Sequence, residues 1–582
     1  MLSSSVQSRR KSHFCQLFFA TVLVYVLLIC VLLQYDSPTP IEPLSTSKPT
    51  SFHATAMYAA EKKELKSMFA WLNNYRDTVS CKGIVEGDVE AIRRSKRWTF
   101  NSSFVWETIR SGYDKCATLK DMFAFHKRAL SHEEEDFPLA YGLLLYKNSE
   151  QILYLLSALY QPQNQFCIAI DCKAAAAFKK EMEIIASCFP NVYIVNVAAV
   201  KWCGFSVLKG VYECLEFLTQ LKSDWKYYQY LSGTDLPLKT NLEMVRIFKA
   251  LNGSFNTVVA DFEHQRSEQS IPHPLPLYKS SLSATFHRRS ADLIVKHRKT
   301  GELLQYLSKV RCSDEAIWTT LAGNPAYLDM PGGFDASEFR RKLEQTYSTV
   351  GFARGQVNFG LYHPEKYYIS RYQTWYYNNR PCYGKMVHFS CVFGVGDLVS
   401  LLARPELVAH KFYLDFQPAA YFCMYEAVRK RALHPNWDFH AAEYRKLPGP
   451  RMMAGQKLRN IDVLSPTATD KIKGKSPSVA HCQCVCLFVC RQFSPGDALL
   501  KRNVSSDENR TKEVDDYPKR RIERRMVGLL KMESGEQQQR EMTAEDHGMA
   551  PADKETHWTT THALDGELVK NTGGQQWQQR DE

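Results

Sequence analysis

The 582-residue sequence lacks the short motifs that mark several large enzyme classes. It contains no G-x-x-x-x-G-K-S/T loop, no G-x-S-x-G turn and no H-E-x-x-H helix. These motifs hold phosphates, present a serine nucleophile and ligate zinc, so their absence removes the main support for kinase-like, hydrolase and metalloprotease activities. The cysteines are scattered and form no repeated C-x-x-C pattern, which argues against a zinc scaffold.

Paired carboxylates of one common kind are also missing. No D-x-D occurs in the chain, and the nearest variant at a plausible strand end is the run Asp261, Phe262, Glu263. Enzymes that use a sugar nucleotide together with a divalent metal commonly hold the metal against the diphosphate with such a pair. If this chain binds a sugar nucleotide, basic side chains must replace the metal.

The composition is that of a globular protein, with 45% hydrophobic, 12% aromatic and 23% charged residues. At about 100 to 200 residues per domain, the length allows several domains and a sizeable core. The formal charge of +12 comes from 74 basic and 62 acidic residues, a mild excess that does not predict nucleic-acid binding. Seventeen cysteines favour an oxidising compartment.

The N-terminal region predicts a membrane anchor. Residues 14–34 are almost all apolar, and a helix of about 20 such residues spans a bilayer. Arg9, Arg10 and Lys11 precede this run, and basic residues stay on the cytoplasmic side. We therefore expect a single-pass type II protein with a cytoplasmic tail at residues 1–13. A cleaved signal peptide is the alternative, but its apolar region usually has about 7 to 15 residues.

Three further regions follow the predicted anchor. Residues 35–75 begin with a stretch rich in Ser, Thr and Pro, which predicts an exposed stem. Residues 76–440 alternate apolar and amphipathic segments and form the predicted globular domain. Residues 441–582 are charged, Gln-rich and poor in apolar residues, so we expect a disordered tail. Within this tail, Cys482, Cys484, Cys486 and Cys490 fit no standard zinc spacing.

The pattern in residues 76–440 predicts an α/β fold. Strands are expected at 139–146, 165–172, 191–197 and 227–233, and helices with apolar residues at i, i+3, i+4 and i+7 spacing at 149–160, 174–189 and 206–222. This alternation is typical of a mostly parallel sheet, whose ligands bind outside the carboxyl ends of the strands. Asp171 and the segment 232–239 fall at such ends.

Two charged positions are candidates for group-transfer chemistry. Glu315 follows Asp314 just before an apolar stretch, and Ser313 could cap a helix there, which would place both acids in its first turn. Complementation of the helix dipole is the simpler explanation for an arbitrary acidic pair. Lys411 lies in an aromatic segment and could pair with a diphosphate, although a surface lysine is the simpler explanation.

Six segments of the chain stand in the order found in one enzyme family: FPLAYGLLLYKNSEQILYLLSALYQPQNQFCIAIDCK, IASCFPNVYIV, WKYYQYLSGTDLPLKTNLEMVR, SDEAIWTT, CVFGVGDL and AHKFYLD. Over residues 80–435 the chain thus resembles the core 2 type β-1,6-N-acetylglucosaminyltransferases, glycosyltransferase family 14. The resemblance implies a GT-A-like α/β fold, a Golgi type II anchor, and metal-independent inverting transfer from a UDP-sugar, with no cofactor.

The resemblance also implies roles for individual residues. Glu315 matches the catalytic base, which takes the proton of the acceptor's 6-hydroxyl as that oxygen attacks the anomeric carbon. Lys411 matches a residue that binds the departing diphosphate, and His388 stands where the family has an arginine. The remaining residues expected to bind the UDP-sugar are Asp171, Trp202 and Tyr146.

The acceptor side departs further from the family. A glutamate that contacts the acceptor aligns near Val258, with Asp261 and Glu263 close by, and Tyr372 replaces an aromatic companion. The expected acceptor is the GalNAc of core 1 mucin-type O-glycans on glycoproteins, which receives GlcNAc or a related hexose. A xylosyltransferase-like enzyme acting on a proteoglycan core and a catalytically silent glycan-binding protein remain alternatives. Nucleic acid is not an expected partner, and dimerisation is left open.

Cysteines and sequons give separate expectations. The resemblance implies four disulfides, which join Cys81 to Cys423, Cys116 to Cys188, Cys167 to Cys214 and Cys382 to Cys391. Cys172, Cys203 and Cys312 are left over, and we hypothesise that the last two pair because both lie near matched segments. At the position where the family has its one unpaired cysteine, this chain has Ser232. A luminal chain would present the glycosylation sequons at Asn101, Asn252, Asn503 and Asn509.

Overall fold

The computed structural model describes residues 69, 72, 75–267, 272–348, 367–376, 380–436, 438–439 and 441–463. All of them belong to the compact unit Met1–Cys486, and the second unit, Leu487–Glu582, lies outside this part of the chain. None of the helices in the described ranges is long and apolar enough to cross a membrane. The anchor predicted at 14–34, most of the stem, the four-cysteine cluster, Asn503 and Asn509 all lie outside the described residues.

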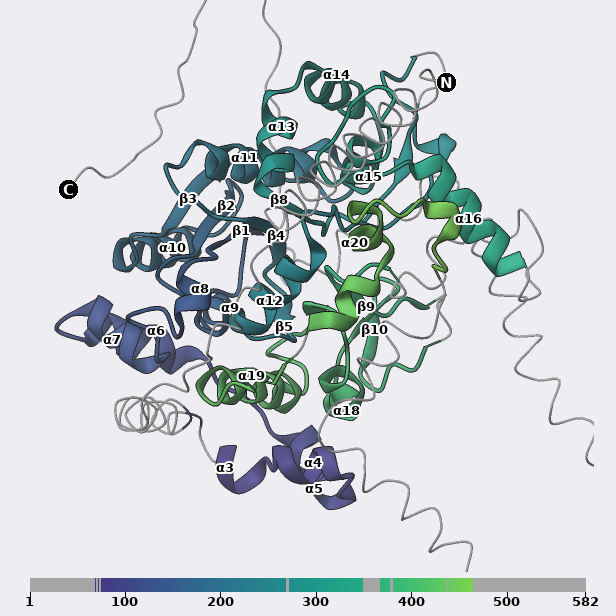
Figure 1. The fold of residues 1–582 in the computed structure, drawn as a ribbon. Helices are drawn as coiled ribbons and strands as arrows, with labels where there is room; N and C mark the ends of the chain where they lie inside the picture. The colour runs from purple at the N-terminus through teal and green to yellow at the C-terminus, as the bar shows by residue number, and fades with distance from the viewer. Residues whose placement is uncertain are drawn as a thin grey trace, which may run out of the picture. The chain divides into compact units, whose positions relative to one another are not determined.

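A five-stranded sheet forms the centre of the fold, in the order β3-β2-β1-β4-β8 (Figure 1). Its strands are β1 (Leu139–Leu145), β2 (Gln165–Asp171), β3 (Val192–Val197), β4 (Tyr227–Ser232) and β8 (Thr285–His287). The first four are parallel, and β8 runs antiparallel to β4. The apolar runs suit a sheet that is covered on both faces. The predicted mostly parallel α/β fold is therefore confirmed.

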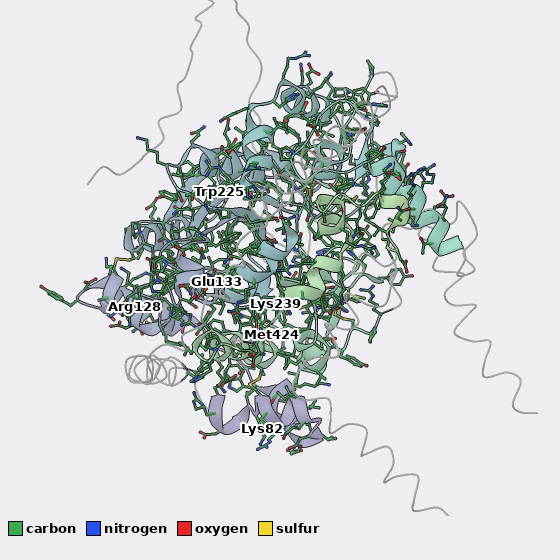
Figure 2. The ribbon with its side chains drawn as sticks, viewed as in Figure 1. Lys82, Arg128, Glu133, Trp225, Lys239 and Met424 are labelled. Carbon is green, nitrogen blue, oxygen red and sulfur yellow. A yellow bond between two sulfur atoms is a disulfide. The ribbon has the colours of Figure 1, made fainter. Side chains whose placement is uncertain are left out.

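Helices join the parallel strands and cover both faces of the sheet. The connecting helices are α9 (Ser149–Leu159), α10 (Ala176–Cys188) and α11 (Phe205–Gln220), and their bounds lie within two residues of those predicted. Successive strand residues point to opposite faces, so Tyr141 packs in one core cluster with α9 and α10, and Ala140 packs in the other with α11. Trp225 and Met424 are among the buried side chains drawn in Figure 2.

Short segments far apart in the sequence build a second, three-stranded sheet beside the first. Its order is β5-β12-β9, formed by β5 (Asp235–Pro237), β12 (Val408–His410) and β9 (Tyr372–Gln373). A hairpin of β10 (Lys385–Val387) and β11 (Ser390–Val392) lies next along the chain. In this sheet His410 stands opposite Asp235 on one side and Gln373 on the other.

Further helices complete the described part of the chain. One of them, α12 (Asn241–Leu251), begins with a capping box in which Thr240 and Glu243 satisfy each other's backbone amides. Others that precede residue 434 are α3 (Tyr75–Thr78), α4 (Cys81–Glu86), α5 (Val89–Arg97), α6 (Ser103–Ser111), α7 (Lys115–Met122), α8 (His132–Glu135), α13 (Arg288–Lys296), α14 (Arg298–Leu307), α16 (Ala336–Ser348), η5 (Val395–Asp397), α18 (Leu398–Leu402) and α19 (Pro418–Leu433).

The ordered chain continues past the predicted boundary at residue 440. Residues beyond it form η6 (Ala441–Lys446), α20 (Pro448–Met453) and η7 (Leu458–Asn460). Tyr444 is buried, and its hydroxyl donates to the Pro405 carbonyl at 2.7 Å. Apolar side chains in this stretch therefore anchor it to the domain, and residues 441–463 do not belong to the predicted tail.

All four implied disulfides form, and so does the hypothesised fifth. The structure joins Cys81 to Cys423, Cys116 to Cys188, Cys167 to Cys214, Cys382 to Cys391 and Cys203 to Cys312. Cys172 is an exposed free thiol. Asn101, just before α6, and Asn252, at the C-terminal end of α12, are both exposed, as glycosylation at either would require.

Candidate active site

Glu315 ends a short 3-10 turn, η2 (Ser313–Glu315), directly before α15 (Ile317–Ala322). The expected helix cap at Ser313 is wrong. Ser313 is itself a residue of the turn, and its buried hydroxyl has no hydrogen-bond partner. The residue that precedes the turn is Cys312, which has a left-handed backbone with φ of 50°. The two acids therefore lie before α15, and the Glu315 side chain keeps 34% of its surface exposed.

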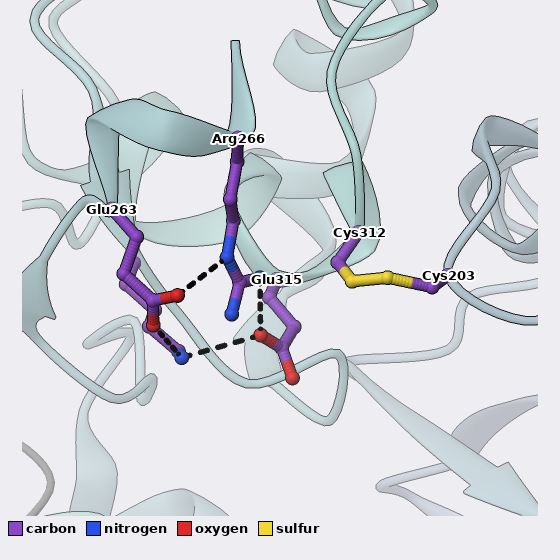
Figure 3. Close-up of a disulfide and its surroundings, with 6 residues drawn as sticks. Cys203, Glu263, Arg266, Cys312 and Glu315 are labelled. Atoms are coloured by element: carbon purple, nitrogen blue, oxygen red, sulfur yellow. Dashed lines mark hydrogen bonds and ion pairs between the residues drawn. A yellow bond between two sulfur atoms is a disulfide. The ribbon is translucent and has the colours of Figure 1, made fainter. Parts of the chain in front are cut away.

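Two basic side chains hold the Glu315 carboxylate (Figure 3). Arg266, from η1 (His264–Arg266), contacts Oε2 at 2.7 Å, and Lys279, from β7 (Tyr278–Lys279), contacts the same oxygen at 3.4 Å. Both cations also pair with Glu263, at 2.8 Å and 2.5 Å respectively. The four residues form a closed ring of alternating charge.

Two members of this partly buried ring, Glu263 and Arg266, have pKa values shifted in favour of their charged forms. Burial alone would raise the pKa of Glu263, but hydrogen bonds from Lys279 and Arg266 outweigh this effect and lower it. The pKa of the Arg266 guanidinium is raised, because the two carboxylates outweigh the cost of its burial. Asp314, next to Glu315, differs: burial, and then the negative charge of Glu315, raise its pKa to about 7.

The structure brings Lys411 and His388 to one place. Lys411 follows β12 and is 8% exposed, and its ammonium donates to the Val387 carbonyl at 3.0 Å. His388 is the next residue of that hairpin and is exposed. It forms the two-residue turn with Phe389, and both have positive φ, 49° and 61°, as a type I′ turn requires. Burial lowers the pKa of Lys411.

A buried carboxylate supports the segment that carries Lys411. Asp235 is fully buried and accepts hydrogen bonds at 2.7 Å from Arg371, from His410 Nδ1 and from the Ser232 amide. Burial acts to raise the pKa of Asp235, but Arg371 and His410 outweigh it and the pKa is lowered. Burial also lowers the pKa of His410.

The side chains of Ser232, His410 and Asp235 do not form a hydrolytic relay. The Ser232 hydroxyl lies 3.2 Å from His410 Nδ1, the same ring nitrogen that faces Asp235. A serine nucleophile and its carboxylate partner use the two different nitrogens of the histidine. The arrangement is therefore suited to holding β5 and β12 together.

Residues expected to bind the nucleotide lie at the carboxyl ends of the strands. Asp171 ends β2, is buried, and accepts from the amides of Lys173 and Val200 at 2.9 Å and 3.3 Å. Tyr146 follows β1 and Trp202 follows β3 in the chain, and their side chains are 56% and 78% exposed.

The segment that follows Lys411, with Tyr413, lies near the residues that follow β1. The Lys411 ammonium lies 5.6 Å from the centre of the Tyr413 ring. Burial raises the pKa of Tyr413, and to a smaller extent the nearby charge of Lys147 lowers it while that of Tyr146 raises it. Lys147 in turn lies 5.1 Å from the Tyr146 ring centre. Tyr413 therefore lies beside the expected diphosphate-binding lysine and within electrostatic reach of the expected donor-site tyrosine.

Of the expected acceptor residues, the structure brings only Glu263 to Glu315. The Asp261 carboxylate pairs with Arg340 of α16 at 3.2 Å. Tyr372 is 8% exposed, with its ring stacked on Phe393 at 5.7 Å and the Arg404 guanidinium 4.0 Å from its centre. The ring is therefore already in contact with two protein groups.

Sequence reasoning missed several residues of the site. Arg266 and Lys279 stand 49 and 36 positions before Glu315, so no local spacing connects them to it. The only available signal was the i, i+3 spacing of Glu263 and Arg266. Within the described ranges, no group of three or more His, Cys, Asp or Glu side chains is placed to hold a metal ion.

Comparisons with known proteins agree with the resemblance. Residues 139–379 match the family model "Branch: Core-2/I-Branching enzyme". The chain is 27% identical over 392 residues to a human beta-1,3-galactosyl-O-glycosyl-glycoprotein beta-1,6-N-acetylglucosaminyltransferase, covering 62% of this chain and 87% of the relative. The Bos taurus enzyme of that name numbered 3 is 28% identical over 401 residues, covering 61% and 83%.

Among solved structures, the crystal structure of S. aureus TarS 1-349 covers 30% of this chain and 55% of that chain. Its TM-score of 0.19 and identity of 11% are too low to support any conclusion.

Proposed function

We propose that this chain, a glycosyltransferase of the Core-2/I-Branching enzyme family, transfers a β-1,6-linked N-acetylglucosamine or related hexose from a UDP-sugar to the GalNAc of core 1 mucin-type O-glycans. One observation supports this most directly. Both cations beside Glu315 contact Oε2, while Oε1 has no ion-pair or hydrogen-bond partner among the described residues. A partly exposed carboxylate oxygen, held in place from its other side, suits a general base.

The proposed reaction is a single displacement. The acceptor's 6-hydroxyl oxygen attacks the anomeric carbon and forms the new glycosidic bond, while the bond from that carbon to the diphosphate oxygen breaks. Glu315 accepts the hydroxyl proton at Oε1, and UDP leaves with the electron pair of the broken bond. Arg266 and Lys279 fix the orientation of the carboxylate. Attack from the face opposite the leaving group inverts the configuration at the anomeric carbon.

In this proposal, Lys411 and His388 stabilise the departing diphosphate in place of a metal ion. Fixed positive charge at the leaving group acts most strongly where water is excluded, and the Lys411 ammonium is largely buried. His388 gives one hydrogen bond when neutral and a positive charge when protonated. Asp171, Trp202 and Tyr146 would contact the nucleotide-sugar, because they stand at the strand ends where ligands of α/β sheets bind.

The acceptor would approach from the side of Glu263, which shares both cations with the base. Asp261 and Tyr372 would act at the margin of this site, since each already has protein partners. The proposed location is the Golgi membrane, with a type II anchor and the catalytic domain in the lumen. Microscopy of the tagged full chain beside Golgi and endoplasmic reticulum markers tests this placement.

The transfer assay uses the full chain with a core 1 glycopeptide and UDP-GlcNAc, UDP-Glc or UDP-Xyl, with and without EDTA. We expect one UDP-hexose to be transferred to the 6-hydroxyl of GalNAc, with a rate that EDTA leaves unchanged. Loss of activity in EDTA, restored by a divalent cation, would contradict the metal-independent mechanism. UDP binding without transfer from any donor would favour a catalytically silent glycan-binding protein.

A further inference from the structure

The disulfide between Cys203 and Cys312 is additional to the four implied by the family resemblance. It connects the loop between β3 and α11 to the turn that carries Glu315 (Figure 3). The backbones meet as well, because the Cys312 amide donates to the Cys203 carbonyl at 2.7 Å. Both cysteines have positive φ, 58° and 50°. The two segments are thus joined by a covalent bond and a hydrogen bond at one point.

On one side of this link is the proposed base. Cys312 directly precedes η2, and the Glu315 amide donates to the Cys312 carbonyl at 3.1 Å. The neighbouring Arg311 amide donates at 2.9 Å to the carbonyl of Arg266, whose guanidinium holds the Glu315 carboxylate. The backbone of Glu315 is therefore tied to the disulfide directly, and its side chain indirectly through η1.

On the other side is the loop proposed to contact the donor. Trp202 directly precedes Cys203 and is 78% exposed. The same loop is bound to Asp171 through the Val200 amide, and the Lys201 amide donates to the Ser206 hydroxyl at 2.8 Å. These bonds hold the loop to β2 and α11 without the disulfide. The disulfide to Cys312 additionally fixes the distance between this loop and the turn that carries Glu315.

We propose that the Cys203–Cys312 disulfide is a positioning element for transfer, which holds the Glu315 turn at a set place relative to the donor-site loop. The inference rests on the proposed function. Neither cysteine touches the reacting atoms, so the effect acts through the placement of Glu315. Misplacing a catalytic group by about 1 Å lowers a rate by as much as about 100-fold.

Of the five described disulfides, this link alone contains no buried cysteine. Each of the other four contains at least one buried cysteine, namely Cys423, Cys188, Cys167 and Cys391. Cys203 and Cys312 are both only partly buried. A mild reductant should therefore open this disulfide first, which allows a test without any substitution.

The principal test compares two double variants of the full chain. Cys203→Ser/Cys312→Ser removes the link, and Cys116→Ser/Cys188→Ser removes a disulfide between α7 and α10 as the control. The two bonds close comparable loops, with separations of 109 and 72 residues. We expect kcat to fall about tenfold or more in the first variant only, while the Kd for UDP changes less than about threefold in both. Equal changes in kcat would overturn the proposal.

Two further measurements keep the test independent of folding yield and of the proposed function. Mild reduction of the unmodified chain, with mass spectrometry to identify the opened pair, should lower kcat in proportion to the opened Cys203–Cys312 fraction, and reoxidation should restore it. Amide hydrogen exchange at residues 311–316 should accelerate in the first double variant and not in the control. Unchanged protection there would refute the positioning role even if no sugar donor were found, whereas faster exchange without transfer would refute only the proposed function.

Discussion

Replacing Asp235 with asparagine should destabilise the protein more than any surface charge change. The side chain keeps its shape but loses the charge that pairs with Arg371, whose guanidinium is only 8% exposed. Removing one partner of a buried ion pair usually costs about 3 to 5 kcal/mol, because the other charge stays buried and unpaired. Asparagine can still accept one of the existing hydrogen bonds. We therefore expect the free energy of unfolding to fall by about 3 kcal/mol, at the lower end of this range.

The measurement is urea unfolding at pH 7 with the disulfides intact, followed by tryptophan fluorescence. The lowered pKa of Asp235 means that its stabilising effect is fully present above the unfolded value of about 3.9, so pH 7 reports all of it. The matched control is Asp292→Asn on α13, where the pair with Arg288 is partly exposed and contributes about 1 kcal/mol or less. Equal losses in the two variants would refute the assigned role of the Asp235 cluster.

Two further predictions concern charge at the site. Lys411→Met should lower kcat about 100-fold or more with little change in the acceptor KM, because the charge acts on the leaving group. The control Lys209→Met, on α11, should change neither kcat nor the acceptor KM. An altered KM with unchanged kcat in Lys411→Met would contradict this role. Because the raised pKa of Asp314 favours its neutral form, the folded chain loses stability as pH rises from about 4 to about 7. Asp314→Asn should therefore gain about 4 kcal/mol of stability over the unmodified chain between pH 4 and pH 8 in urea titrations, and a pH-independent difference would show that the pKa of Asp314 is not raised.

Much of the central sheet could be predicted from sequence because each strand is a long apolar run followed by a clear amphipathic helix. The parallel strands β1 to β4 are six or seven residues long and were predicted to within one residue. The small sheet was not predictable, since β5, β9 and β12 have only two or three residues each. Such strands form through pairing between distant segments and leave no periodic pattern.

The candidate site also has residues that could be predicted from the sequence and residues that could not. Glu315 and Lys411 could be named from the family resemblance, but the ring around Glu315 depends on segments that only the fold brings together. The expected Ser313 cap was wrong because the disulfide and the backbone bond at Cys312 hold residues 313–315 in a 3-10 turn. The predicted boundary at 440 was too early because a few apolar residues, such as Tyr444, suffice to anchor a polar segment.

The most direct test of the central claim is the kcat of Glu315→Gln with a core 1 acceptor and the donor found for the unmodified chain. The substitution keeps the size of the side chain and removes its ability to accept a proton, and loss of a general base lowers rates about 100- to 10,000-fold. Glu302→Gln, in a surface ion pair on α14, is the matched control. We predict a loss in this range for Glu315→Gln, with UDP affinity retained and the control unaffected. A variant that transfers the sugar at the rate of the unmodified chain would show that Glu315 is not the base.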